Sequence, residues 1–154
     1  GNQLIEVSMI HKKNTKKDAL KKAKEVLDIV KLPRIENLLK KYPHELSGGM
    51  RQRVMIGISL MCDPLFIVAD EPTTALDVTT QKEILKIFND LKKYKDITIA
   101  LISHDIAVIS EVSDTILIMN EGRIIEKGNC REVLTSPKHE YTKHLLSCVP
   151  EWMK

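Results

Sequence analysis

Aromatic residues, cysteine pairs and long apolar runs are scarce in this chain of 154 residues. Aromatic side chains make up 4% of it, and its three cysteines, Cys62, Cys130 and Cys148, form no C-x-x-C pattern. An odd number without that spacing indicates free thiols in a reducing compartment rather than a disulfide frame or zinc site. No apolar run approaches the roughly 18 residues that cross a bilayer, and no signal peptide is visible. We therefore expect any membrane association to run through a partner protein.

The charge distribution excludes a further class of function. The formal net charge is +3, and no dense Lys/Arg block with interleaved aromatic residues occurs. Nucleic acid is therefore not an expected partner. The basic stretch from Lys12 to Lys24 is interrupted by Asp18 and indicates a solvated helix face. A hydrophobic share of 43% suffices for a core of about one domain.

Apolar runs and turn residues predict strands that alternate with helices, which indicates a parallel α/β architecture. The continuous run 65–69 predicts a strand that is buried on both faces, and 97–102 predicts the next strand. Residues 115–119 and 123–127 flank Asn-Glu-Gly and predict a hairpin.

Helical spacing and capping residues predict the helices. Thr15 with Asp18 resembles a capping box, Asp77 is a candidate N-cap, and Ser136-Pro137 suits the start of the last helix. The predicted helices cover 19–30, 35–41, 49–62, 78–94, 106–112, 131–134 and 136–147.

Three short motifs have the residue types that nucleotide chemistry requires. Ser47-Gly48-Gly49 precedes a helix, where small residues let backbone N–H groups approach a phosphate. The strand 65–69 ends in Asp70 and Glu71, one acid suited to a magnesium ion and one to a water. After the next strand comes His104, whose neutral imidazole can bond a phosphate oxygen. A phosphate loop of the form G-x-x-x-x-G-K-[ST] occurs nowhere in the sequence.

Three segments, in this order along the chain, resemble motifs of the ATPase subunit of ABC transporters. They are residues 46–53 (Leu-Ser-Gly-Gly-Met-Arg-Gln-Arg), 70–77 (Asp-Glu-Pro-Thr-Thr-Ala-Leu-Asp) and 102–105 (Ile-Ser-His-Asp). The resemblance covers essentially the whole chain. It implies a P-loop NTPase-like α/β fold with a mostly parallel sheet, helices on its faces and part of a helical subdomain. The implied domains are a partial helical subdomain at 1–46, part of the catalytic core at 47–128, and a C-terminal helical extension at 129–154.

The resemblance implies a role in ATP hydrolysis for three of these residues. Asp70 is expected to hold Mg²⁺, directly or through water. Glu71 is the expected general base, which polarises the water that attacks the γ-phosphate. His104 resembles the family's switch histidine, which senses the γ-phosphate.

Other motif residues are implied to act across a head-to-tail dimer with a second ATPase subunit. Ser47, Gly48 and Gly49 resemble the signature, which binds the ATP that the opposite subunit holds. Asp77 lies in a segment similar to the D-loop, which contacts the partner's site. The family places its phosphate loop upstream of the signature. We therefore expect this chain to be the C-terminal portion of a longer subunit and to be inactive by itself.

Two features favour one subfamily. Met50 followed by Arg-Gln-Arg is typical of oligopeptide, dipeptide and nickel importers. Residues 136–146 are similar to a C-terminal segment of peptide-importer ATPases, although Glu140 replaces the usual proline. The expected function is an ATP-hydrolysing subunit that powers import of oligopeptides or dipeptides. It would work with transmembrane permease subunits, peripherally at the cytoplasmic face of the membrane.

Three alternatives stay open at this point. A nickel importer shares the Met-Arg-Gln-Arg string. ABC ATPases of translation or DNA repair also have a signature, an Asp-Glu pair and a D-loop, although the C-terminal segment favours transport. A non-catalytic module that only binds partners is the third, because the phosphate loop is missing from the sequence.

Overall fold

A computed structural model of the chain describes residues 1–148, apart from the side chains of residues 94 and 95. The contacts form two compact units, Gly1–Ala100 and a second unit that begins at Leu101. The predicted C-terminal extension at 129–154 therefore lies partly outside the described residues. No helix of the described part is long and apolar enough to span a membrane.

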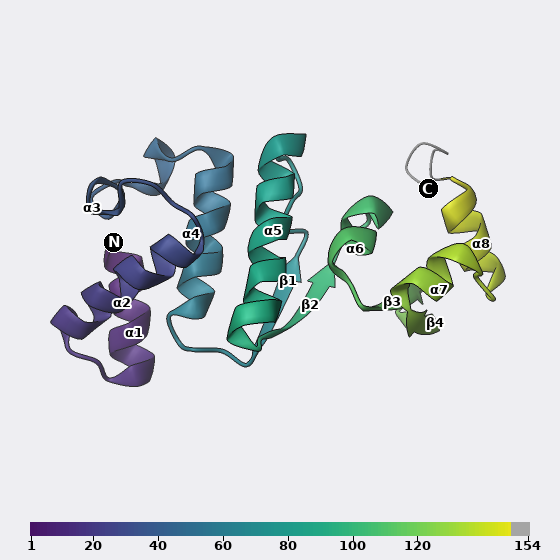
Figure 1. Cartoon of the computed structure of the whole chain (residues 1–154), viewed down its shortest axis with the longest axis horizontal. Coiled ribbons are helices and arrows are strands. Elements are labelled where there is room, and N and C mark those ends of the chain that lie inside the picture. Colours follow the sequence, from purple (N-terminus) through teal and green to yellow (C-terminus); the bar gives the residue numbers. More distant parts are fainter. Residues whose placement is uncertain (149–154) are drawn as a thin grey trace. The chain divides into compact units, whose positions relative to one another are not determined.

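Helices form the first part of the first unit (Figure 1). The elements are α1 (Asn2–Lys12), α2 (Lys16–Ile29), α3 (Ile35–Leu38), a 3₁₀ turn η1 (Pro43–Glu45) and α4 (Gly48–Leu60). Helices α1, α2 and α4 pack on one another, and Leu4, Val26 and Leu27 are almost fully buried in this unit. Burial of such apolar side chains is the main stabilising contribution to this bundle.

The capping residue of α2 is confirmed, but α1 was not predicted. Thr15 Oγ1 accepts the N–H of Asp18 at 3.2 Å and donates to Asp18 Oδ2 at 2.5 Å. Helix α1 has no side-chain cap at Gly1, so it lacks the start signal on which the other helix predictions depended. Helix α3 is shorter than predicted and ends at Leu38.

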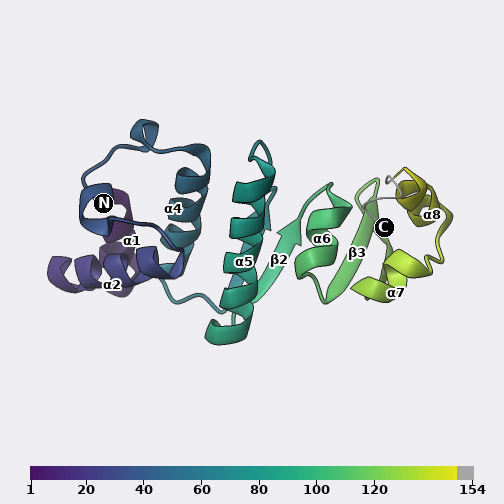
Figure 2. The ribbon, with the colours of Figure 1, turned by 45° about the horizontal axis from the view of Figure 1, so that its top comes forward.

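A long helix and two strands complete the first unit. They are β1 (Phe66–Asp70), α5 (Val78–Lys95) and β2 (Thr98–Ile102), and β1 and β2 form a two-stranded sheet. Helix α5 packs against α4, and both helices can be followed in Figures 1 and 2. Its buried side chains are Ile84, Leu85, Ile87, Phe88 and Leu91.

The prediction that strand 65–69 is buried on both faces is wrong. Ile67 and Ala69 are buried, whereas Phe66 and Val68 are 56% and 60% exposed. Successive side chains of a strand point to opposite faces. The alternation shows that only one face of β1 is covered in the described chain.

The second unit contains the predicted hairpin between three helices. The elements are α6 (Ile106–Val112), β3 (Thr115–Asn120), β4 (Arg123–Asn129), α7 (Cys130–Thr135) and α8 (Glu140–Ser147). Strands β3 and β4 pair antiparallel, with Asn120 opposite Arg123. Glu121 and Gly122 both have positive φ, 48° and 74°, which a tight two-residue hairpin turn requires. The core of this unit consists of Ile109, Ile116, Ile118, Cys130 and Val133.

The predicted start of the last helix is wrong. Helix α8 begins at Glu140, with the His139 ring as its cap: His139 Nδ1 accepts the N–H of Tyr141 at 3.1 Å. The carboxylate of Glu126 accepts the N–H groups of Lys138 and His139 at 2.8 and 3.1 Å. These bonds from β4 satisfy the backbone of the preceding turn, so it does not need to continue as a helix.

The two phenylalanines of the chain allow a matched test of this core. Phe88 is 2% exposed and Phe66 is 56% exposed. We expect Phe88→Ala to lower the free energy of unfolding by about 3–5 kcal/mol, because it leaves a cavity. Phe66→Ala should cost about 1 kcal/mol or less, the range of strand propensity. Urea unfolding of both variants measures the difference, and equal losses would contradict this core.

Candidate nucleotide-facing site

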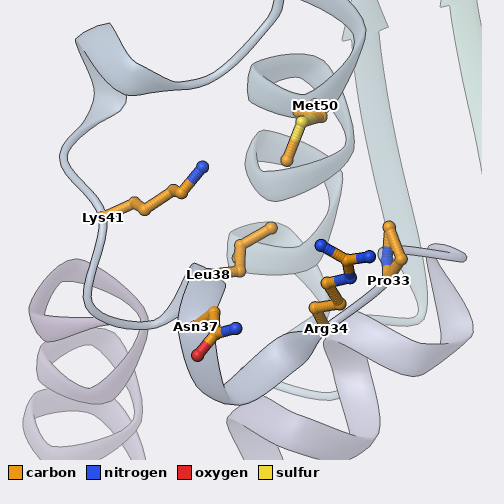
Figure 3. Close-up of a pocket in the computed structure, with 6 residues that line it drawn as sticks. All are labelled: Pro33, Arg34, Asn37, Leu38, Lys41 and Met50. Carbon is orange, nitrogen blue, oxygen red and sulfur yellow. The ribbon is translucent and has the colours of Figure 1, made fainter.

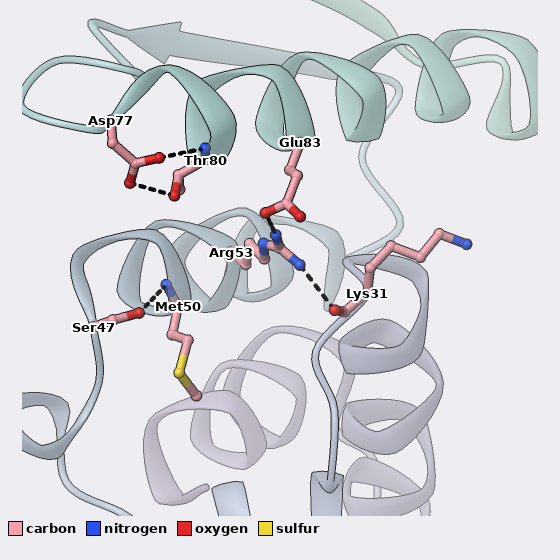
Figure 4. Close-up of polar contacts among 7 residues, drawn as sticks. All are labelled: Lys31, Ser47, Met50, Arg53, Asp77, Thr80 and Glu83. Carbon is pink, nitrogen blue, oxygen red and sulfur yellow. Dashed lines mark hydrogen bonds and ion pairs between the residues drawn. The ribbon is translucent and has the colours of Figure 1, made fainter.

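Six of the seven predicted site residues lie in the first unit. Ser47, Gly48 and Gly49 lie at the start of α4, and Asp77 caps the start of α5. Asp70 ends β1, Glu71 follows it, and His104 belongs to the second unit. The structure brings the starts of α4 and α5 together, as Figure 4 shows.

Ser47 is the N-cap of α4. Its Oγ accepts the N–H of Met50 at 3.3 Å, and the residue is exposed. The hydroxyl proton is still available for an external acceptor. The first N–H groups of a helix, here those of Gly48 and Gly49, have no carbonyl partner within the helix. Together with the helix dipole they favour an anion at this end.

Gly49 controls how closely the two helices approach. A Cβ atom at Gly49 would lie 2.2 Å from Thr80 Cγ2, which is a severe clash. A Cβ atom at Gly48 would lie 3.5 Å from Leu76 Cδ2, an ordinary contact. The glycine at position 49 is therefore required by packing against α5, a role that its motif did not reveal.

Asp77 is the N-cap of α5, as predicted. Its Oδ1 accepts the Thr80 N–H at 2.9 Å, and its Oδ2 accepts the Thr80 hydroxyl at 2.6 Å. The Thr80 hydroxyl, and then the Thr80 N–H, lower the pKa of the Asp77 carboxyl group. Because both bonds favour the charged form, Asp77 is an anion near neutral pH.

Glu71 lies in a tight turn directly after β1. Its φ is 46° and that of Ala75 is 63°, a left-handed conformation that costs a non-glycine residue roughly 1–2 kcal/mol. The Thr74 hydroxyl donates to Glu71 Oε2 at 2.6 Å, and the Thr74 N–H donates to the Glu71 carbonyl at 3.2 Å. The hydroxyl bond orients the Glu71 carboxylate, and the backbone bond closes the turn. Strained backbone of this kind concentrates at functional sites.

Asp70 suits a magnesium ion that shares its ligands with a phosphate. It is an exposed carboxylate at the end of β1, and Mg²⁺ is usually bound by one or two carboxylates, waters and substrate phosphates. Among residues 1–148, no group of three His, Cys, Asp or Glu side chains could hold a metal ion. The described residues therefore fit Mg²⁺ only when phosphate oxygens complete its ligands.

His104 is exposed between two residues that fix the backbone on either side. Ser103 Oγ accepts the N–H of Asp105 at 3.0 Å. Asp105 caps α6, and its Oδ1 accepts the N–H groups of Ala107 and Val108 at 2.9 and 3.4 Å. The start of α6 therefore fixes the backbone that carries the imidazole.

Arg53, in α4, connects this helix to α5 and to the segment after α2 (Figure 4). Its Nη1 donates to the Lys31 carbonyl at 2.9 Å, and its Nη2 forms an ion pair with Glu83 of α5. The arginine side chain is 13% exposed. The motif suggested only subfamily membership for this residue. Its structural role was missed because both partners, Lys31 and Glu83, are distant from Arg53 in sequence.

Thr74 and Thr80 were also missed as supporting residues. Each lies three positions after the carboxylate that it bonds, Glu71 and Asp77. An acidic residue followed three positions later by threonine is a local signal that could have identified both pairs.

Substitution of the two signature glycines tests the close approach of the helices. We expect Gly49→Ala to destabilise the chain by about 1–3 kcal/mol, because the new methyl group overpacks the contact with Thr80. Gly48→Ala should be neutral or slightly stabilising, since alanine favours a helix.

The double variant Gly49→Ala/Thr80→Ser removes the clashing methyl group and keeps the hydroxyl that bonds Asp77. It should recover most of the lost stability in urea unfolding. An absence of recovery would show that the cost of Gly49→Ala arises elsewhere.

Comparison with known proteins agrees with this geometry. The family model for ABC transporters matches residues 2–74. The oligopeptide transport ATP-binding protein OppD of Escherichia coli strain K12 is 47% identical over 150 residues, or 97% of this chain. The glutathione import ATP-binding protein GsiA of the same strain is 42% identical over 151 residues. The chain spans 44% of the former and 24% of the latter, less than half of each.

Solved structures give the same result for the fold. A dimeric structure of the ABC transporter cassette MJ0796 matches with a TM-score of 0.66 and 30% identity, over 77% of this chain and 50% of that one. An inward-facing structure of a putative metal-chelate type ABC transporter matches with a TM-score of 0.77 and 23% identity, over 96% and 58%.

The α/β architecture and the ordered motifs agree with the matches in sequence and structure. The chain belongs to the ABC transporter family of ATP-binding domains.

Proposed function

We propose that the chain is the signature-bearing part of an ATP-hydrolysing subunit that powers import of oligopeptides or dipeptides. The observation that supports hydrolysis most directly is the Glu71 carboxylate, which Thr74 orients at the end of β1. The names of OppD and GsiA, which refer to oligopeptide transport and glutathione import, support a peptide substrate. They do not favour the alternatives in translation, DNA repair or nickel import.

In this proposal, residues at the ends of β1 and β2 carry out hydrolysis. Glu71 accepts a proton from the attacking water, and its bond from Thr74 fixes the direction of that carboxylate. Asp70 holds Mg²⁺, which neutralises phosphate charge when bound. His104 hydrogen-bonds the γ-phosphate. ATP is the substrate, and its phosphate loop comes from outside this sequence.

The starts of α4 and α5 face a second ATPase subunit in the same proposal. Ser47, Gly48 and Gly49 direct N–H and hydroxyl groups at the nucleotide of that subunit, and Asp77 contacts its site. We further infer that the assembly binds transmembrane permease subunits and lies peripherally at the cytoplasmic face. The division into 1–46, 47–128 and 129–154 remains part of this proposal.

The first test uses the chain as it stands. We expect neither tight binding nor hydrolysis of Mg-ATP, because the phosphate loop that makes most phosphate contacts is missing from these residues. Calorimetric titration and a phosphate-release assay measure both properties. Micromolar affinity together with steady turnover would contradict the expectation.

A second test assigns the chemistry, in a polypeptide that also supplies the phosphate loop. Glu71→Gln should lower the hydrolysis rate by about 10²–10⁴-fold and preserve ATP binding, because an amide cannot accept the proton. Asp70→Asn should weaken nucleotide binding as well, since it weakens the Mg²⁺ site. His104→Ala should lower the rate through loss of γ-phosphate positioning.

Glu121→Gln provides a matched control for the base. Glu121 has nearly the same φ as Glu71, 48° against 46°, but lies in the β3–β4 turn. In single-turnover assays, the hydrolysis rate of Glu121→Gln should equal the wild-type rate. A wild-type rate for Glu71→Gln would exclude Glu71 as the base.

A further inference from the structure

A small pocket lies beside helix α4, and none of the residues assigned to ATP hydrolysis lines it (Figure 3). Its volume is about 170 Å³, and its lining consists of Pro33, Arg34, Asn37, Leu38, Lys41 and Met50. Leu38 is buried and Met50 is half-buried, so these two side chains provide an apolar floor. The other lining residues are exposed.

Two cationic side chains, Arg34 and Lys41, line the pocket beside these apolar residues. Figure 3 shows the Arg34 guanidinium and the Lys41 ammonium directed toward the space around Leu38 and Met50. Within residues 1–148, neither side chain has a hydrogen-bond or ion-pair partner. A guanidinium and an ammonium that converge on one space suit a carboxylate, which accepts several charge-assisted hydrogen bonds.

The neighbouring acids do not satisfy these cations. Glu36 Oε1 accepts from Lys24 Nζ at 3.1 Å, and Glu45 Oε2 accepts the Tyr42 N–H at 2.6 Å. Residues 1–46 contain eleven Lys and Arg against six Asp and Glu, a formal charge of +5. The charge of this region therefore attracts an acidic partner to the pocket.

The backbone at Arg34 is also unusual. Its φ and ψ are 52° and 51°, a left-handed conformation that arginine rarely adopts. The turn that positions the guanidinium is therefore maintained against a local conformational cost.

We propose that this pocket binds an acidic segment of a partner protein. One carboxylate lies between Arg34 and Lys41, and an adjacent apolar side chain packs on Leu38 and Met50. A pocket of about 170 Å³ suits one or two side chains, because whole small-molecule sites are usually 300–1,000 Å³. The apolar floor favours a peptide over free phosphate. None of the lining residues has a role in the proposed hydrolysis, so the inference stands independently of it.

Methionine methyl groups give a direct readout of binding. The whole chain, labelled with ¹³C at its methionine methyls, is titrated with the blocked peptide Ala-Glu-Leu-Leu-Glu-Ala. We expect a saturable shift of the Met50 signal, whereas Met55 and Met61 of the same helix region serve as internal controls. The peptide with both glutamates replaced by lysine should leave Met50 unchanged.

Matched charge variants locate the binding site. Arg34→Gln/Lys41→Gln should weaken the binding about tenfold or more, the loss expected when two charge-assisted hydrogen bonds disappear. Lys21→Gln/Lys40→Gln removes the same charge at exposed positions that do not line the pocket. It should change the affinity less than about twofold, because exposed charges that form no direct contact contribute little. Arg34→Gly should also weaken binding. Glycine adopts the left-handed backbone of position 34 easily, so this variant removes the guanidinium and keeps the turn.

Several results would overturn the proposal. They are equal weakening by both double variants, equal shifts of Met50, Met55 and Met61, or no shift of Met50 at millimolar peptide. Parallel titrations use Mg-ATP and phosphatidylserine vesicles. A Met50 response to either probe without a response to the acidic peptide would exclude a peptide partner.

Discussion

The close approach of α4 and α5 is the constraint on which the candidate site depends. A side chain at Gly49 would overlap Thr80, and Thr80 in turn bonds the Asp77 carboxylate through its N–H and hydroxyl. The ion pair of Arg53 with Glu83 joins the same two helices one turn further along. The two helix starts therefore form one rigid anion-facing edge, which tolerates little change in the volume between them.

Different interactions fix Glu71, the acid that follows β1. There, a hydrogen bond from Thr74 and a strained turn orient Glu71. In the proposed function, these two devices serve different tasks: the turn positions the proton acceptor, and the helix edge faces the nucleotide of a second subunit. Each task depends on fixed orientation rather than on a change of charge, in agreement with catalysis by preorganised groups.

Features of this structure that depend on neighbouring residues were predicted better than features that depend on contacts between distant residues. The caps at Thr15 and Asp77 and the hairpin around Gly122 are confirmed, since each depends on a few neighbouring residues. Burial of β1 was predicted wrongly because it depends on what covers the sheet, which an apolar run cannot show. The start of α8 was missed because Glu126, fourteen positions earlier, bonds the turn before it. In the candidate site, the motif residues were identified from the sequence, and their roles remain predictions. The supports of the site, such as Arg53, were not identified, because their partners are distant in sequence.

In the proposed function, this chain completes a nucleotide site whose phosphate loop belongs to another subunit. Mixed dimers of a phosphate-loop-containing polypeptide test it most directly. One subunit carries Ser47→Arg and the other a defective phosphate loop. If Ser47 acts across the interface, both defects fall in one composite site, and the purified mixed dimer should retain partial ATP hydrolysis. Complete loss of activity would mean that Ser47 acts on nucleotide within its own subunit, and would contradict the account.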